Sequence, residues 1–306
     1  MAARHLLSVT DLSKQEFEAV LSDAAAWKQT PIGEQLAGKT IALIFGKPST
    51  RTRVSFSVGI HQLGGLPFHL SEQDMQIRTS ESIEDTARVL SRYVDAIVIR
   101  TFAQQDVVEL AAAASVPVIN ALTDEQHPCQ GLTDVFTLRE RLPDYAGRKI
   151  TYLGDGNNVA ASLAQAGVMS GFKVCLCFPE VCDLAAERMR ELEGLALEHS
   201  TEVWVERDPQ AAATGASALY TDVWISMGQD SDGEKRQALM PYQLNRELIQ
   251  KALPEVVVMH CLPAHRGEEI TDEAMDGPWS AVLDQAENRL HVQKSLLVFL
   301  LGGAGH

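Results

Sequence analysis

The sequence predicts an α/β protein made of two doubly wound parallel-sheet domains that face each other across a cleft. Short apolar runs alternate with amphipathic stretches in both halves of the chain, as in strands joined by crossover helices. The chain has 306 residues, enough for two domains that each bury a core. Polar motifs follow many of the apolar runs, at the strand ends where doubly wound sheets bind ligands.

The first half shows this alternation clearly. Apolar runs that predict strands occupy residues 40–45, 96–99 and 117–120. Patterns that predict helices occupy residues 53–63, 82–93 and 105–114. Because a helix separates each strand from the next, we expect the strands to be parallel.

The second half repeats the order. Predicted strands occupy residues 149–153, 173–178, 203–205, 218–220 and 256–259. Pro143 and Gly147 interrupt the pattern between the halves, so we place a first domain at 1–143 and a second at 144–285. Residues 286–306 carry a last amphipathic helix, which we expect to return to the first domain.

Charge and cysteine content narrow the function. The formal net charge of −15 disfavours nucleic acid and anionic membrane surfaces as partners. Five cysteines do not indicate a disulfide framework, and the N-terminus has no apolar signal region. No run of 18 apolar residues occurs. We therefore expect a cytoplasmic protein that neither spans nor binds a membrane.

The segment Ser49-Thr50-Arg51-Thr52-Arg53 directly follows the first predicted strand. Hydroxyls, guanidiniums and the free N–H groups of a starting helix together suit a small dianion such as a phosphate. The plainer alternative is a capped helix with solvated arginines, but capping explains only one hydroxyl. A Walker A loop would need glycine at Ile41, so ATP is not implied.

Two further strand ends carry polar residues. Arg100 follows the strand at 96–99, and His127 and Gln130 follow the strand at 117–120. Arg100 would add positive charge for the same anion. His127 offers an imidazole that titrates near neutrality, and Gln130 offers an amide that can both donate and accept hydrogen bonds. A solvated arginine and a structural histidine are the alternatives.

The second half offers two weaker motifs. Gly154 and Gly156 resemble the start of a dinucleotide fingerprint, but Val159 replaces its third glycine, so NAD is disfavoured. The adjacent asparagines that follow Gly156 suit the backbone of a polar amino acid. Cys261 lies between His260 and Pro263 without the spacing of a zinc site, so we predict no metal and no cofactor.

Together these motifs resemble the aspartate/ornithine carbamoyltransferase family over essentially the whole chain. The similar segments are Phe45, 47–53, 127–130, 222–228 and 260–267. The last two resemble the branch that uses ornithine. The aspartate branch is expected to have a His-Pro-Leu-Pro-Arg type segment in place of the last one, which makes Cys261 the discriminating residue.

The resemblance implies transfer of the carbamoyl group of carbamoyl phosphate to the side-chain amine of L-ornithine, giving L-citrulline and phosphate. It implies binding of carbamoyl phosphate by Ser49, Thr50, Arg51, Thr52, Gln76, Arg100, His127, Gln130, Cys261, Leu262 and Arg289. Ornithine would be held by Asn158, Asp222, Ser226 and Met227. The implied catalytic residues are Arg51, Arg100, His127 and Cys261.

Gln76 matches a position that similar enzymes contribute from a neighbouring subunit, so the resemblance implies a homotrimer or a multiple of trimers. Two alternatives stay open: a carbamoyltransferase for another amine such as putrescine, and an NAD-binding oxidoreductase. The same residues would serve citrulline formation and its reversal, so the sequence does not give the physiological direction.

Overall fold

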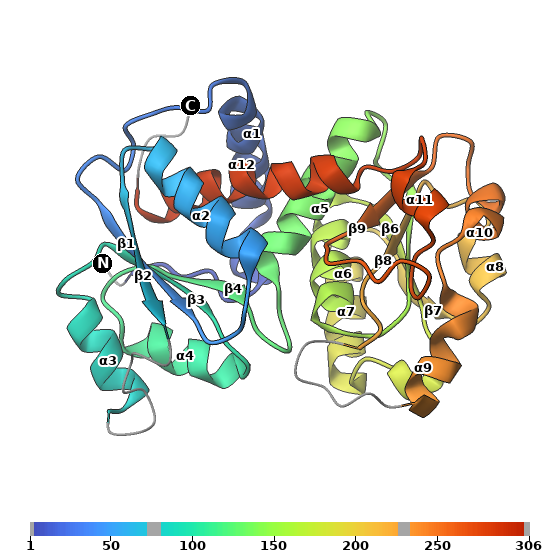
Figure 1. Cartoon of the computed structure of the whole chain (residues 1–306), viewed down its shortest axis with the longest axis horizontal. Helices are drawn as coiled ribbons and strands as arrows, with labels where there is room; N and C mark the ends of the chain where they lie inside the picture. The colour runs from blue at the N-terminus through green and yellow to red at the C-terminus, as the bar shows by residue number, and fades with distance from the viewer. Residues whose placement is uncertain (1–2, 72–80, 226–232, 303–306) are drawn as a thin grey trace. The chain divides into compact units, whose positions relative to one another are not determined.

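The computed structural model describes residues 3–71, 81–225 and 233–302 (Figure 1). The chain divides into two compact units, Met1–Leu132 with Glu287–His306, and Thr133–Ala286. The division falls inside helix α5 (Pro128–Arg141) rather than near residue 143. Leu138 and Leu142 explain the difference, because both pack into the hydrophobic core of the second unit.

The first unit contains a parallel sheet of β1 (Thr40–Phe45), β2 (Leu66–Ser71), β3 (Ala96–Arg100) and β4 (Val118–Leu122). The strand order is β2-β1-β3-β4, so the chain reverses its direction of winding between β1 and β3. Sequence patterning did not predict β2. Its Leu66 and Phe68 are exposed at the edge of the sheet, so β2 lacks the continuous apolar run of a buried parallel strand.

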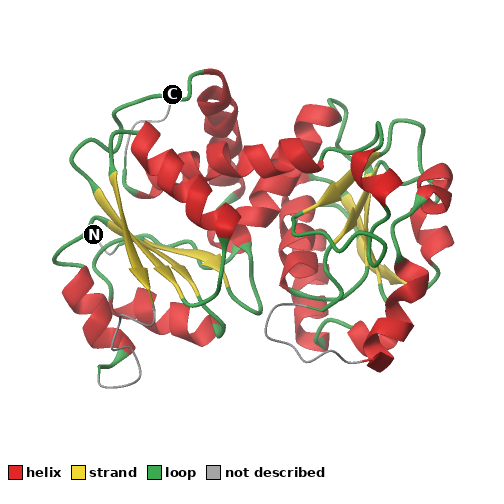
Figure 2. Ribbon diagram, in the orientation of Figure 1, coloured by secondary structure: helices red, strands yellow, loops and turns green. Residues whose placement is uncertain are grey.

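Helices cover both faces of this sheet (Figures 1 and 2). On one face, α3 (Ile83–Leu90) and α4 (Gln104–Ala113) share a core with β1 and β3. On the other lie α1 (Lys14–Gln29) and α2 (Thr50–Gln62). The sequence patterns above did not predict α1, although Ser13 and Glu16 form a capping box at its start. The end of α12 (Val282–Leu300) contacts α1, where Ser295 Oγ donates to Val20 O at 2.7 Å.

The second unit holds a parallel sheet of β5 (Lys149–Leu153), β6 (Lys173–Cys177), β7 (Val203–Glu206), β8 (Ala218–Thr221) and β9 (Val257–His260). Its order is β7-β6-β5-β8-β9, so winding reverses between β5 and β8. The prediction of two parallel-sheet α/β domains is confirmed.

The helices of the second unit pack on two separate cores. On one face lie α6 (Asn158–Ser170) and α7 (Ala186–Glu198), and on the other α8 (Pro209–Ala213), α10 (Arg246–Lys251) and α11 (Asp272–Asp276). A further helix, α9 (Gly233–Leu239), precedes α10. Residues of β6 alternate between the two cores, and buried Cys175 and Cys177 belong to the core that contains α8, α10 and α11. No helix in the described ranges has both the length and the apolar character to cross a bilayer.

Candidate active site

Each sheet carries its polar motifs where the winding reverses, which is where doubly wound sheets form crevices. In the first unit, β1 leads into Ser49 and β3 ends at Arg100. These strands are neighbours, with Phe45 paired to Arg100. In the second unit, β5 leads into Gly154 and β8 leads into Asp222. The sequence-predicted groups therefore gather at one point within each unit.

Ser49 does not cap α2 through its side chain. It occupies the N-cap position with extended backbone (φ −160°, ψ 109°), but its hydroxyl makes no capping hydrogen bond. This observation weakens the interpretation of the segment as an ordinary capped helix. The first N–H groups of a helix have no intrahelical acceptors, so an anion at this position would be bound by the α2 terminus with Ser49 and half-buried Arg51.

Arg289 reaches the same end of α2 from α12. Its Nη2 donates to Thr52 Oγ1 at 2.6 Å, and both side chains are buried. The bond places a guanidinium in the first turn of α2. Only the family resemblance pointed to Arg289 at the level of sequence, because 237 positions separate it from Thr52.

His127 adds a neutral donor beside this charge. Its pKa is well below the ordinary value because the ring is buried and because the positive charges of Arg289 and Arg100 oppose protonation. Arg100 is itself buried at the end of β3, and Gln130 is buried in the first turn of α5. Like charges held together in a protein interior favour binding of an anion among them. The first unit therefore presents the types of group that are needed to bind a phosphate and polarise a neighbouring carbonyl oxygen.

Lys47 connects the loops that follow three strands, a role that the sequence motifs did not assign. Its ammonium pairs with Asp124 and lies 4.2 Å from the centre of the Phe102 ring. Gly46 N also donates to Arg100 O at 2.8 Å. These contacts hold the loops after β1, β3 and β4 together. The feature of the sequence that could have indicated this role is the position of Lys47 directly before Pro48 and Ser49.

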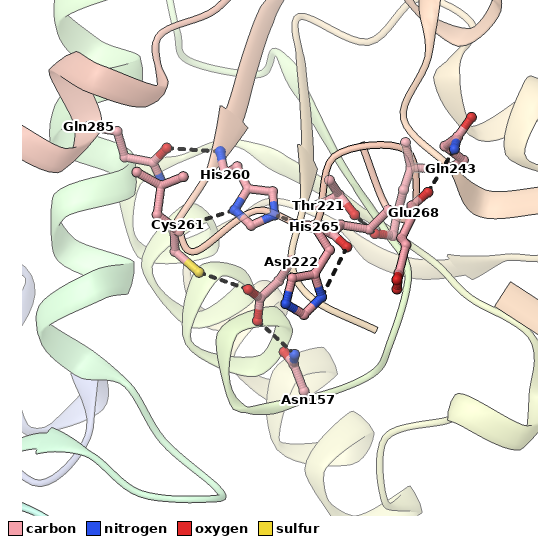
Figure 3. A network of polar contacts seen from close by, with 12 residues as sticks. Asn157, Thr221, Asp222, Gln243, His260, Cys261, His265, Glu268 and Gln285 are labelled. Carbon is pink, nitrogen blue, oxygen red and sulfur yellow. Dashed lines mark hydrogen bonds and ion pairs between the residues drawn. The ribbon is translucent and has the colours of Figure 1, made fainter. Parts of the chain in front are cut away.

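Asp222 is the centre of the polar network in the second unit (Figure 3). Its Oδ2 accepts from Asn157 Nδ2 at 2.9 Å, and its Oδ1 accepts from Cys261 Sγ at 3.0 Å. Asn157 also caps α6, because its Oδ1 accepts the N–H of Val159 at 2.9 Å. The carboxylate is thus held between an amide and a thiol. The sequence analysis assigned Asn158, the first residue of α6, to the substrate and gave no separate role to the neighbouring Asn157.

The backbone after Cys261 is held by buried side chains. Leu262 has a positive φ of 60°, which is uncommon for a residue other than glycine. Its N–H donates to His260 Nδ1 at 2.9 Å, so the ring proton is on Nε2. Nε2 faces Glu269 Oε1 at 3.1 Å, and both side chains are fully buried. The bond between Leu262 and His260 supports the left-handed conformation.

The glycines after β5 have structural roles that do not require a dinucleotide. Gly154 has φ 131°, and a Cβ on Gly156 would lie 2.2 Å from Cys182 O. The Asn157 side chain already accepts N–H groups at the start of α6, where a dinucleotide pyrophosphate would bind. The NAD alternative therefore gains no support.

Two groups of described residues contain metal-ligand types. In the first, ligand atoms of Asp222, His260 and Cys261 lie within 4.8 Å of one another. However, both His260 nitrogens already make hydrogen bonds. In the second group, formed by His265, Glu268 and Glu269, the Glu268 carboxylate pairs with Arg236 at 3.2 Å.

Three site residues expected from the family resemblance lie outside the described residues: Gln76, Ser226 and Met227. The remaining ones fall into two groups. The first unit contains Ser49, Thr50, Arg51, Thr52, Arg100, His127, Gln130 and Arg289. The second contains Asn158, Asp222, Cys261 and Leu262.

A candidate anion site with a buried histidine in one unit, and a carboxylate–thiol pair in the other, are features expected of a group-transfer enzyme with two substrates. Residues 4–140 match the carbamoyl-P binding domain of aspartate/ornithine carbamoyltransferase, and residues 146–300 match its Asp/Orn binding domain. The chain belongs to the aspartate/ornithine carbamoyltransferase family.

Three relatives named as ornithine carbamoyltransferases or as an acetylornithine transcarbamylase are similar to this chain over nearly its whole length. An ornithine carbamoyltransferase from Thermococcus kodakarensis is 49% identical over 99% of this chain and 98% of its own length. The solved ornithine carbamoyltransferase of Pyrococcus furiosus is 46% identical, with a TM-score of 0.95 over 99% of this chain and 98% of that one. An acetylornithine transcarbamylase complexed with acetylcitrulline is 31% identical, with a TM-score of 0.88 over 97% and 98% of the two chains.

Proposed function

We propose that this protein transfers the carbamoyl group of carbamoyl phosphate to the side-chain amine of L-ornithine, giving L-citrulline and phosphate. The observation that carries the proposal is the 3.0 Å contact between Cys261 Sγ and Asp222 Oδ1. These residues come from the two segments that resemble the ornithine-using branch. Their contact supports a shared role at the second substrate.

The chemistry assigns distinct roles to the first unit. The amine nitrogen forms a bond to the carbamoyl carbon while the bond from that carbon to the phosphate oxygen breaks, so negative charge grows on the carbonyl oxygen. Arg100, His127 and Thr52 are donor types suited to that oxygen. Arg51 and the α2 terminus would stabilise the departing phosphate. His127 acts here as a donor, because its low pKa keeps it neutral.

The amine must be neutral to attack. With a lysine-like pKa of about 10.4, it is neutral roughly one time in a thousand near pH 7.4, a cost of about 4 kcal/mol. Asp222 and Cys261 would orient the amine, and the departing phosphate is a suitable proton acceptor. We assign no protein side chain as general base. Asn158, Ser226 and Met227 would contact the amino acid portion of the substrate.

We also propose a cytoplasmic homotrimer, or a multiple of trimers, in which Gln76 reaches a neighbouring site. Exposed apolar side chains on α2 and the edge strand β2 support this assembly: Val54, Val58, Leu66 and Phe68. Ser57 Oγ and His69 Nε2 join these two elements at 3.0 Å. An apolar surface of this kind suits a subunit interface. All five cysteines are free thiols, which suits a reducing compartment.

An assay for ureido product tests the proposed reaction. Carbamoyl phosphate would be supplied with ornithine, putrescine, acetylornithine or aspartate in parallel. We expect ornithine to be used far better than the other three. The acetylornithine arm is informative because an acetylornithine transcarbamylase shares the fold. Preferential use of any other amine would replace the proposal with that specificity.

A further inference from the structure

Gln285, in the first turn of α12, lies in a polar network that the proposed chemistry does not use. It is 1% exposed. Its Oε1 accepts the His260 backbone N–H at 3.0 Å (Figure 3). Its Nε2 donates to Asp134 Oδ1 at 2.7 Å and to the Tyr220 hydroxyl at 3.1 Å. One amide thus uses its acceptor and both of its donor hydrogens.

These bonds reach the two strands that carry the thiol–carboxylate contact. His260 ends β9 and directly precedes Cys261, while Tyr220 lies in β8 two positions before Asp222. The strands are paired neighbours, with Thr221 opposite His260. Any shift between these strand ends would change the 3.0 Å distance between Cys261 Sγ and Asp222 Oδ1.

We propose that Gln285 is a positioning residue for Cys261. It holds the ends of β8 and β9 in the relation that lets the thiol donate to Asp222. The three hydrogen bonds of Gln285 go to neither the thiol nor the Asp222 carboxylate, and it acts through the backbone of His260 and the hydroxyl of Tyr220. The expected effect of Gln285 on ornithine kinetics rests on the proposed function, whereas its expected effect on the reactivity of the Cys261 thiol does not.

The chemistry of this position favours an amide. Asp134 is fully buried, so a glutamate at 285 would place a second carboxylate beside it and would have no hydrogen to donate. Burial raises the pKa of Tyr220 well above its usual range, and the negative charge of Asp134 adds to this shift. The hydroxyl therefore stays neutral, and it accepts from Gln285 while keeping its own proton. Methionine would match the glutamine in length but make none of the three bonds.

The test compares Gln285→Met with Gln293→Met. Gln293 lies two turns later on the same helix and is fully buried, and among the residues that the structure describes neither of its amide atoms has a hydrogen-bond partner. The same change there removes no hydrogen bond. Cys261 is the accessible thiol to follow, because the other four cysteines are buried. The readout is its rate of alkylation by iodoacetamide in the folded protein, with the modified residue identified by mass spectrometry.

A thiol that donates to a carboxylate must break that bond before it reacts, so a looser contact speeds alkylation. We expect Gln285→Met to accelerate alkylation of Cys261 about tenfold, the scale of losing one buried hydrogen bond. The Michaelis constant for ornithine should rise by a similar factor, and by more than that for carbamoyl phosphate. Gln293→Met should change neither quantity.

A second variant guards against loss of folding. Tyr220→Phe keeps the ring, which stacks on Tyr152 at 5.8 Å between centroids, and removes one acceptor of the Gln285 amide. It should accelerate alkylation in the same direction but less. Unchanged alkylation in folded Gln285→Met, or in Tyr220→Phe if the first variant does not fold, would overturn the proposal. Failure of the parent protein to carbamoylate ornithine would refute the proposed function and leave this thiol test intact.

Discussion

Replacing Asn157 with serine removes one of its two roles and keeps the other. The Asn157 side chain caps α6 through Oδ1 and donates to the Asp222 carboxylate through Nδ2 at 2.9 Å. Serine is also a good N-cap, but its shorter side chain cannot replace the amide at Asp222. Alanine at the same position would remove both interactions. The pair of variants therefore separates helix capping from support of the active site.

The structure sets the size of each effect. Asp222 is 5% exposed, so its bond to Asn157 is shielded from water. Loss of a hydrogen bond to a charged group costs about 1.5–3 kcal/mol, equal to a fall of roughly 10- to 150-fold in kcat/KM for ornithine. Loss of the cap costs about 1 kcal/mol of folding stability. We expect the kinetic loss in both variants, and the additional loss of stability only in Asn157→Ala.

Steady-state kinetics and urea denaturation measure the two quantities separately. The Michaelis constant for carbamoyl phosphate should change less than that for ornithine in either variant, because the residues expected to bind the phosphate at the start of α2 belong to the first unit. Unchanged kcat/KM for ornithine in Asn157→Ser would refute the assignment of the Asn157–Asp222 bond to the active site. Equal urea midpoints for the serine and alanine variants would refute the capping role.

Arg51→Ala should weaken carbamoyl phosphate capture by several kcal/mol and leave the fold intact, since a charged hydrogen bond to phosphate is lost; unchanged kinetics would remove Arg51 from the anion site. Cys261→Ala should impair ornithine use more than carbamoyl phosphate binding, as steady-state constants for both substrates would show, and equal effects would contradict its placement. His127 has a folded-state pKa well below its usual 6.5, so its contribution to stability is present above that pH and is lost as pH falls below it. The urea midpoint of the parent should therefore fall between about pH 7.5 and pH 5.5, and it should fall less in His127→Gln. An identical fall in the two proteins would contradict the burial of a neutral ring.

Local sequence patterns were sufficient for most of the fold. The apolar runs that became β1, β3 and β4 are short and continuous, as expected for strands buried on both faces. Edge strand β2 lacks this signal, because Leu66 and Phe68 are exposed and Pro67 interrupts the pattern. Helix α1 was not predicted although its capping box is visible in the sequence, because it precedes the first strand and does not join two strands.

The candidate site was predictable only in part. Ser49, Arg100 and His127 follow predicted strands, and parallel strands bring their carboxyl ends to one edge of a sheet. The hydrogen bond between Asn157 and Asp222 could not be predicted in this way. It depends on which side chain reaches Asp222, 65 positions away in the sequence. No local pattern carries that information.

The class of fold, the proposed anion-binding helix terminus and the resemblance to a carbamoyltransferase family all followed from the amino-acid sequence, because each is read from short motifs whose own residues are close together in the chain. The hydrogen bonds and ion pairs that fix the side chains of the candidate site depended on the packing of segments that are distant in the sequence. That packing places Arg289 on Thr52, Lys47 on Asp124, and Gln285 between β8 and β9. Such contacts require side chains to be oriented correctly across long sequence separations, since hydrogen bonds form only at short range and with aligned donors.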